Sequence, residues 1–221
     1  SKGDLIGHRP YPCDLRRRHS RRPAPGDPGP GACDRRRPPG GSTGAPQTFL
    51  QDRHFASWTE TTVKYYFRAF HGIDHDRVRK VVLWGSEREI FQQRERKAQV
   101  VNWLTNTLFL NSFRAGDDEW LRYVDRINAF RPYFIRGYAS SLYELAKFIE
   151  QRELRIHPPR FVYSSAEMLR PFMREQIERV FGSKVYDFYG SREVGAIAGE
   201  CHEGSRHVFT FNNWVESAPT G

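Results

Sequence analysis

Hydrophobic and polar residues follow two alternating patterns between about residues 116 and 190. Segments with apolar residues at helical spacing alternate with short runs that are rich in β-branched and aromatic residues. In chain order these segments are 117–130, 134–138, 140–151, 160–166, 170–181 and 184–190. A regular alternation of helices and strands is typical of a parallel sheet covered by helices. The pattern therefore predicts an α/β fold, with a mostly parallel sheet flanked by helices.

Shorter patterns extend this prediction toward both ends of the chain. Further strands are expected at 48–51, 80–85, 107–113, 196–200 and 207–211, of which the last two form a short antiparallel C-terminal part. Asp52 is a suitable N-cap for a helix that runs to about Phe70. The mixed-charge run 87–97 continues as a helix or as an exposed loop.

The first forty residues have a different composition from the rest of the chain. They hold nine Arg and one Lys against four Asp, together with eight Pro and six Gly, and so supply most of the formal net charge of +9. A segment with so few apolar residues cannot offset the entropy of ordering, so residues 1–40 are expected to be disordered. Residues 41–221 are expected to form the folded part.

The origin of this arginine-rich arm has two interpretations. Clustered arginines can bind nucleic acid or another polyanion without sequence selectivity. Alternatively, residues 1–40 are an out-of-frame translation or a gene-model artefact, because the folded pattern begins abruptly at Gly41. We favour the artefact. A continuation of the folded part's sequence in another reading frame upstream of codon 41 would support this interpretation.

Composition also restricts the class of protein. No apolar run approaches the roughly 20 residues that a membrane-spanning helix needs. The basic start has no apolar segment of the kind found in secretory signals, and three cysteines make no disulfide framework. We therefore expect a cytoplasmic protein that is not embedded in a membrane.

Three polar loops follow strands of the expected parallel sheet, where ligands of such sheets bind. They are GYASS after 134–138, SSAE after 160–163 and YGSRE after 184–188. Tyr189 could stack on a base and Glu193 could hold Mg²⁺ beside phosphates. The alternative is that Tyr189 packs in the core, that Glu193 pairs with Arg192, and that Glu167 merely caps the helix that follows it.

A glycine-rich stretch, Gly40–Pro46, precedes the first expected strand. Glycines allow the backbone to approach phosphate oxygens, and Ser42 and Thr43 add hydroxyl donors. The stretch lacks the Gly-Lys-Ser/Thr ending of the P-loop. By itself it is equally consistent with a linker.

Taken together, these motifs resemble the adenylate-forming superfamily, and most closely its phenylacetate–CoA ligase group with the capsule-biosynthesis-like members. The resemblance covers about residues 41–216. It rests on GGSTGAPQ, on RPYFIRGYASSLYELAKFI and, most specifically, on the long block SSAEMLRPFMREQIERVFGSKVYDFYGSREVGAIAGEC. It implies a fragment of the large N-terminal domain, without the upstream part and without the C-terminal lid domain.

The resemblance also implies roles for individual residues. Those that match nucleotide-binding motifs are Gly41, Ser42, Thr43, Gly44, Ser165, Ala166, Glu167, Tyr189, Gly190, Ser191 and Arg192. Thr43 would hold the departing pyrophosphate, Tyr189 the adenine ring and Glu193 the Mg²⁺, so Thr43 and Glu193 are the implied catalytic residues. Arg192 stands where many members have a threonine, so either Ser191 or Arg192 meets the α-phosphate.

On the acyl side, the resemblance matches Tyr138, Ala139 and Ser140 to a loop that lines the substrate. Tyr138, Phe134 and Trp84 could form a pocket for an aryl acid, or they could belong to the core.

The implied reaction uses ATP, Mg²⁺ and coenzyme A to activate a carboxylate, with an aryl acid such as phenylacetate as the default. The catalytic lysine of the lid domain has no counterpart here. Two alternatives therefore remain: an inactive remnant, and a polyanion-binding module.

A metal site is a further possibility near the C-terminus. Cys201, His202 and His207 have the ligand types of a Zn²⁺ site but lack the paired Cys-x-x-Cys spacing. A structural cysteine beside surface histidines is the alternative.

Overall fold

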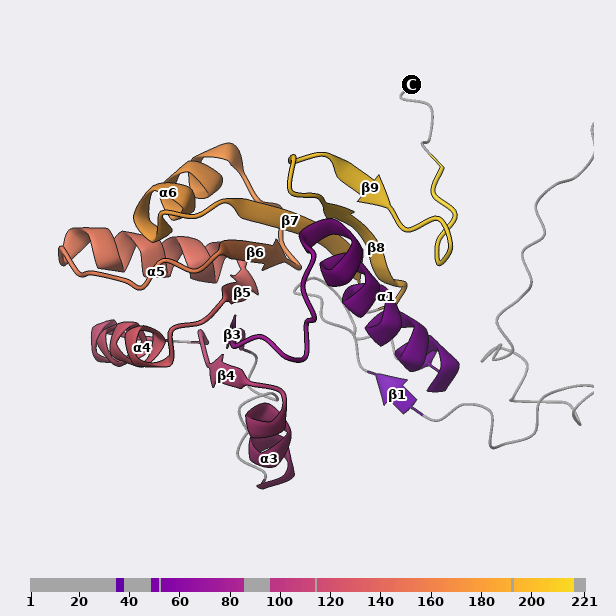
Figure 1. Ribbon diagram of the computed structural model, residues 1–221, viewed down its shortest axis with the longest axis horizontal. Helices are drawn as coiled ribbons and strands as arrows, with labels where there is room; N and C mark the ends of the chain where they lie inside the picture. Colours follow the sequence, from indigo (N-terminus) through magenta and orange to yellow (C-terminus); the bar gives the residue numbers. More distant parts are fainter. Residues whose placement is uncertain are drawn as a thin grey trace, which may run out of the picture. The chain divides into compact units, whose positions relative to one another are not determined.

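The computed structural model describes residues 35–37, 49–51, 53–85, 96–113, 115–191 and 193–216 (Figure 1). They fall into two compact units, 1–60 and 61–221. In the first unit, β1 (Arg35–Arg37) pairs antiparallel with β2 (Phe49–Gln51). Three arginines of the arm that we expected to be disordered thus form a strand, and residues 1–34 and 38–40 lie outside the described residues.

The second unit is built on a seven-stranded sheet with the order β4-β3-β5-β6-β7-β8-β9. The strands are β3 (Lys80–Leu83), β4 (Thr107–Leu110), β5 (Phe134–Tyr138), β6 (Phe161–Ser165), β7 (Val185–Ser191), β8 (Gly195–Glu200) and β9 (Arg206–Val208). The five strands from β4 to β7 are parallel, and β8 and β9 are antiparallel additions. This arrangement confirms the predicted fold class.

The described helices are α1 (Arg53–His71), α3 (Arg96–Leu104), α4 (Asp117–Phe130), α5 (Ala139–Gln151) and α6 (Pro171–Phe181). Sequence signals explain several of their ends. Acidic residues fill the first turn of α4, where they complement the helix dipole. Pro171 starts α6, where its missing N–H costs nothing, and Gly182 ends it in the left-handed conformation with φ of 61°. No helix among the described residues is long and apolar enough to cross a membrane.

One face of the sheet packs against α4, α5 and α6, which form a layer in Figure 1. Its core is mainly aliphatic. Leu142, Leu145 and Ile149 of α5 are buried against Ile135 and Val162 of the central strands. Apolar residues at helical spacing supply this face, which is the reason that the sequence pattern located these helices correctly.

The opposite face carries a core that is almost entirely aromatic. It joins Tyr66 and Phe67 of α1 to Phe134, Phe161 and Phe188 of the strands. The rings pack in stacked and edge-on pairs; the Phe134 and Phe161 rings, for example, lie 5.3 Å apart at an interplanar angle of 5°. Such pairs add to the free energy of area burial. Phe134 is fully buried here, so it belongs to the core.

Candidate active site at the carboxyl edge of the sheet

The loops after β5, β6 and β7 meet at one edge of the sheet because the three strands are adjacent and parallel. Tyr138 at the end of β5 pairs with Ser165 of β6, and Ser165 pairs in turn with Phe188 of β7. The sheet thus brings the GYASS, SSAE and YGSRE segments to the same carboxyl edge, where ligands of open α/β sheets bind.

A hydrogen bond connects the first two loops. The carboxylate of Glu167 accepts the backbone N–H of Ser140, in the first turn of α5, at 2.9 Å. Glu167 therefore caps α5, and the alternative that it caps the helix that follows it is wrong. The N-cap residue of α5, Tyr138, makes no side-chain cap hydrogen bond, so this distant carboxylate satisfies a donor that the helix itself leaves open.

The turn that delivers Glu167 has an unusual backbone conformation. Ala166 has a φ of 71°, a region that favours glycine. The preceding Ser165 is buried, and so is the hydroxyl of Ser164, which has no hydrogen-bond partner within the described part of the chain. The end of β6 is therefore held in a conformation that its own residue types do not favour, a feature that is common in binding sites.

The end of β7 exposes an aromatic ring. Tyr189 is 57% exposed, which excludes the alternative that it packs in the core. Gly190 follows at an irregularity in the β7–β8 pairing, and a Cβ at this position would lie 2.6 Å from the backbone oxygen of Gly195. Only glycine fits here, so the chain can turn sharply and leave the Tyr189 ring free to receive a planar ligand.

The turn beyond β7 carries the candidate metal ligand. The Ser191 hydroxyl accepts the backbone N–H of Val194 at 3.1 Å and so stabilises this turn. Glu193 lies exposed in the turn, and its carboxylate has no hydrogen-bond or ion-pair partner among the described residues. A hard oxygen ligand that is available in this way suits Mg²⁺.

Tyr138 forms the opposite end of the site, with the residue that follows β3 as its partner. Its ring stacks on Trp84, with centroids 4.0 Å apart and an interplanar angle of 25°. Arg136, on the same face of β5, also contacts Trp84, with its guanidinium carbon 5.0 Å from the centre of the Trp84 ring. Ala139 is buried behind them. Arg136 has no motif signal, and only the alternation of β5 could have placed it beside Tyr138.

Five of the residues implied by the resemblance lie outside the described residues. They are Gly41, Ser42, Thr43, Gly44 and Arg192. Their roles at the phosphates stay predictions.

The zinc alternative finds no support. Across the described ranges, no group of three or more His, Cys, Asp or Glu side chains is placed to hold a metal ion. Cys201 is buried, whereas the His207 ring stacks on Phe70 at 5.0 Å. His202 meets the backbone oxygen of Phe70 through Nδ1 at 3.2 Å. Both histidines therefore pack against α1.

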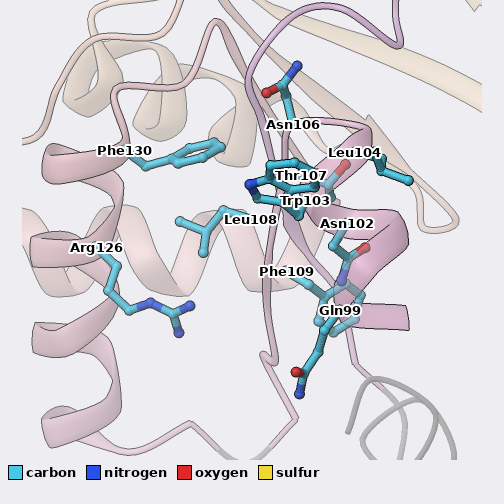
Figure 2. Close-up of a pocket in the computed structure, with 10 residues that line it drawn as sticks. All are labelled: Gln99, Asn102, Trp103, Leu104, Asn106, Thr107, Leu108, Phe109, Arg126 and Phe130. Atoms are coloured by element: carbon cyan, nitrogen blue, oxygen red, sulfur yellow. The ribbon is translucent and has the colours of Figure 1, made fainter. Parts of the chain in front are cut away.

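A separate hollow in the described structure lies away from this edge. It has a volume of about 860 Å³ and is formed by α3, β4 and α4. In Figure 2, Leu108 of β4 and Phe130 of α4 extend into the space between these two elements, and the exposed Trp103 ring lies beside them. The lining of the hollow includes no acidic residue and no glycine, and the loops after β5, β6 and β7 do not contribute to it.

Comparison with known proteins gives one curated relative. The chain is 25% identical over 170 residues to the protein CapK of Staphylococcus aureus. The match covers 76% of this chain and 37% of CapK. No family model matches the sequence.

Solved structures share the fold. An open conformation of 2-hydroxyisobutyryl-CoA ligase in complex with 2-HIB-AMP and CoA matches with a TM-score of 0.54 and 16% identity, over 80% of this chain and 41% of that one. VinN matches with a TM-score of 0.52 and 16% identity, over 76% and 39%. The luciferase-like enzyme from the nonluminescent Zophobas morio mealworm matches with a TM-score of 0.52 and 13% identity, over 78% and 38%.

The chain spans about two fifths of the length of the proteins that it matches. Within that span, the three loops that carry the motifs of the resemblance follow the neighbouring strands β5, β6 and β7. In fold as in motifs, the chain resembles the adenylate-forming ligases.

Proposed function

We propose that the protein takes part in the ATP-dependent activation of a carboxylic acid as an acyl-adenylate, followed by transfer of the acyl group to the thiol of coenzyme A. In the first step, a carboxylate oxygen attacks the α-phosphorus of ATP and pyrophosphate leaves. In the second step, the thiol sulfur attacks the acyl carbon and AMP leaves with the bonding electron pair. The meeting of three glycine- and serine-rich loops at one carboxyl edge, in a fold shared with such ligases, carries the proposal.

Each described residue of this edge has a chemical role in the proposal. The exposed Tyr189 ring stacks on the adenine, next to the sharp turn at Gly190. The available carboxylate of Glu193 fits Mg²⁺, which would neutralise charge on the phosphates when bound. Glu167 keeps the start of α5 in position, since it already holds the Ser140 N–H. Catalysis in such chemistry is largely positioning and charge neutralisation.

The acyl group would lie on the Tyr138 side of the edge. The stacked rings of Tyr138 and Trp84 offer an apolar and aromatic wall there. An aryl acid such as phenylacetate is the first acid to test.

The test is acid-dependent exchange of labelled pyrophosphate into ATP in the presence of Mg²⁺. It is run with the chain alone and with the C-terminal domain of a related ligase added in trans, because the chain spans two fifths of its matches. We expect exchange to depend on an added carboxylic acid and to fall at least 100-fold in Glu193→Ala. Glu203→Ala, another exposed glutamate in a turn of this hairpin region, is the matched control and should exchange normally.

Exchange that continues at the wild-type rate in Glu193→Ala would contradict the role of Glu193 as a metal ligand. The absence of exchange with every acid tested, with and without the added domain, would contradict the proposal and favour the inactive remnant.

A further inference from the structure

Arg136 is a charged residue inside the aromatic face of the sheet. Along β5, Phe134, Arg136 and Tyr138 point to the same face because alternate strand residues do so. The guanidinium carbon lies 5.0 Å from the centre of the Trp84 ring and 5.5 Å from the centre of the Tyr163 ring. Two aromatic rings therefore hold the guanidinium, Trp84 just after β3 and Tyr163 in β6, and these two strands flank β5.

The guanidinium has no anionic partner in the part of the chain that the structure describes. Its Nε is buried and finds no hydrogen-bond partner among the described residues. An arginine is always ionised, and a desolvated charge is costly unless it is paired and hydrogen-bonded. Contacts with aromatic faces offset only part of that cost. An unsatisfied donor on a permanent cation thus marks a place for an anion.

Among the described residues, the groups that interact with Arg136 bring no unpaired negative charge to it. Its charge disfavours protonation of His75, whose pKa lies below the usual range, mainly because of burial and partly because of Arg136. Lys80 donates to the backbone oxygens of His75 and Thr105 at 2.8 and 2.6 Å. The carboxylate beside His75, that of Asp76, already pairs with Lys64 at 2.8 Å. These described neighbours leave the guanidinium uncompensated.

Arg136 also lies at a suitable depth below the proposed acyl site. It pairs with Tyr163 in the row of residues directly beneath Tyr138 and Ser165, which end their strands. Two residues of a strand span about 6–7 Å. An acid that binds beside Tyr138 would place its reacting carboxylate at the strand ends. The guanidinium of Arg136 would then lie about 6–7 Å deeper, a distance that a short carbon chain spans.

We propose that Arg136 is a specificity-determining residue that selects carboxylic acids with a second anionic group, so that the substrate class is the dicarboxylic acids. The inference rests on the proposed function, because it takes the acid to bind at the same edge. One carboxylate is activated at the strand ends, and the other accepts two N–H bonds from the guanidinium. Trp84 and Tyr163 fix the plane of the fork and so favour bidentate pairing.

The experiment compares glutarate with butyrate, which lacks only the second carboxylate. Binding to the whole chain is measured by calorimetry and by the side-chain Nε–Hε signal of Arg136 in nitrogen-15 spectra, assigned through its loss in Arg136→Lys. We expect glutarate, and not butyrate, to move this signal and to bind about tenfold more tightly. Arg136→Gln should abolish the preference, and Arg136→Lys should reduce it, because an ammonium lacks the planar fork. Arg126→Gln, an exposed arginine on α4, should keep it.

Equal binding of the two acids to the wild type, or an unchanged preference in a folded Arg136→Gln, would overturn the inference. If Arg136→Gln does not fold, the wild-type signal and the Arg136→Lys preference decide the question. Pyrophosphate exchange separates this inference from the proposed function. Wild-type exchange that is no faster with glutarate than with butyrate, and that Arg136→Gln leaves unchanged for both acids, overturns the role of Arg136 alone. Glutarate binding through Arg136 without exchange by any acid contradicts adenylation and leaves the anion site.

Discussion

The two faces of the sheet are built from different chemistry. The face beneath α4, α5 and α6 is packed with leucine, isoleucine and valine. The face toward α1 is packed with phenylalanine and tyrosine, and it also contains buried polar atoms that lack hydrogen-bond partners. Among the described residues, these atoms are Nε2 of His71, Nε of Arg136 and the hydroxyl of Tyr163. The hydroxyl of Ser164, at the end of β6, is a fourth buried atom without a hydrogen-bond partner in the same residues.

This difference indicates that the aliphatic face mainly stabilises the fold, whereas the aromatic face also contributes to binding. Aliphatic packing stabilises a fold without offering directional contacts. Aromatic rings bury comparable area and can also hold a cation such as Arg136 or carry a polar atom such as the Tyr163 hydroxyl. Burial raises the pKa of Tyr163 and keeps that hydroxyl neutral. The aromatic face thus pays a free-energy cost for its unsatisfied groups, as binding sites commonly do.

The largest expected effect tests whether the aliphatic face serves stability alone. Leu145 is fully buried in its core. Leu145→Ala should lower the free energy of unfolding by about 2–5 kcal/mol, because it removes buried methyl groups and leaves a cavity. Urea denaturation measures this loss, and nucleotide affinity per folded molecule should not change. A loss of affinity in the folded variant would show that the faces are not separate.

The next effect concerns the ion pair that joins α6 to the antiparallel end of the sheet. Arg174 donates to both carboxylate oxygens of the buried Glu200, at 2.9 and 3.0 Å. Arg174→Ala leaves that carboxylate without its main partner and should cost about 3 kcal/mol. Arg179→Ala on the same helix, whose pair with Glu150 is exposed, is the control and should cost less than about 1 kcal/mol. Equal losses in urea denaturation would contradict this assignment.

A pH-dependent effect sharpens the description of the aromatic face. Burial lowers the pKa of His71 to about 4, from an ordinary 6.5. The unfolded chain therefore binds the proton more readily, so this contribution to stability is complete above about pH 6.5 and is lost as the pH falls toward 4. Because the residue is partly exposed, the slope should stay below about 1 kcal/mol per pH unit. His71→Phe should weaken the pH dependence of the free energy of unfolding between about pH 4 and 6.5. An unchanged pH dependence would mean that another group titrates in this range.

The smallest effect concerns the strained turn at the end of β6. Ala166→Gly relieves the left-handed φ of 71° and should stabilise the chain by about 0.5–1 kcal/mol. Thermal unfolding measures this gain. Destabilisation instead would mean that the alanine methyl makes a contact that outweighs the backbone strain.

Sequence patterns located the elements whose apolar residues are buried. The predicted strand 134–138 coincides with β5, and the helix predicted over 117–130 coincides with α4. The pattern missed α3, because its apolar residues are exposed and form no one-sided stripe. These residues are Val100, Val101, Trp103 and Leu104.

The site was only partly predictable, because its contacts join distant segments. Motifs pointed to Tyr189 and Glu193, which a single segment after the predicted strand 184–188 supplies. The hydrogen bond from Ser140 to Glu167 depends on the pairing of β5 with β6, so the sequence suggested a cap on the wrong helix. Arg136 occupies an ordinary strand position, and its aromatic neighbours come from the end of the β3 segment, at Trp84, and from β6.

The central claim is that the carboxyl edge of β5, β6 and β7 binds ATP, and titration calorimetry tests it directly. Two exposed aromatic residues are compared: Tyr189 at this edge, and Trp103 beside the large hollow at α3. We predict that Tyr189→Ala weakens ATP binding about tenfold or more through loss of stacking on the adenine, and that Trp103→Ala binds like the wild type. Normal binding by Tyr189→Ala together with weak binding by Trp103→Ala would contradict the claim and place the nucleotide in the hollow.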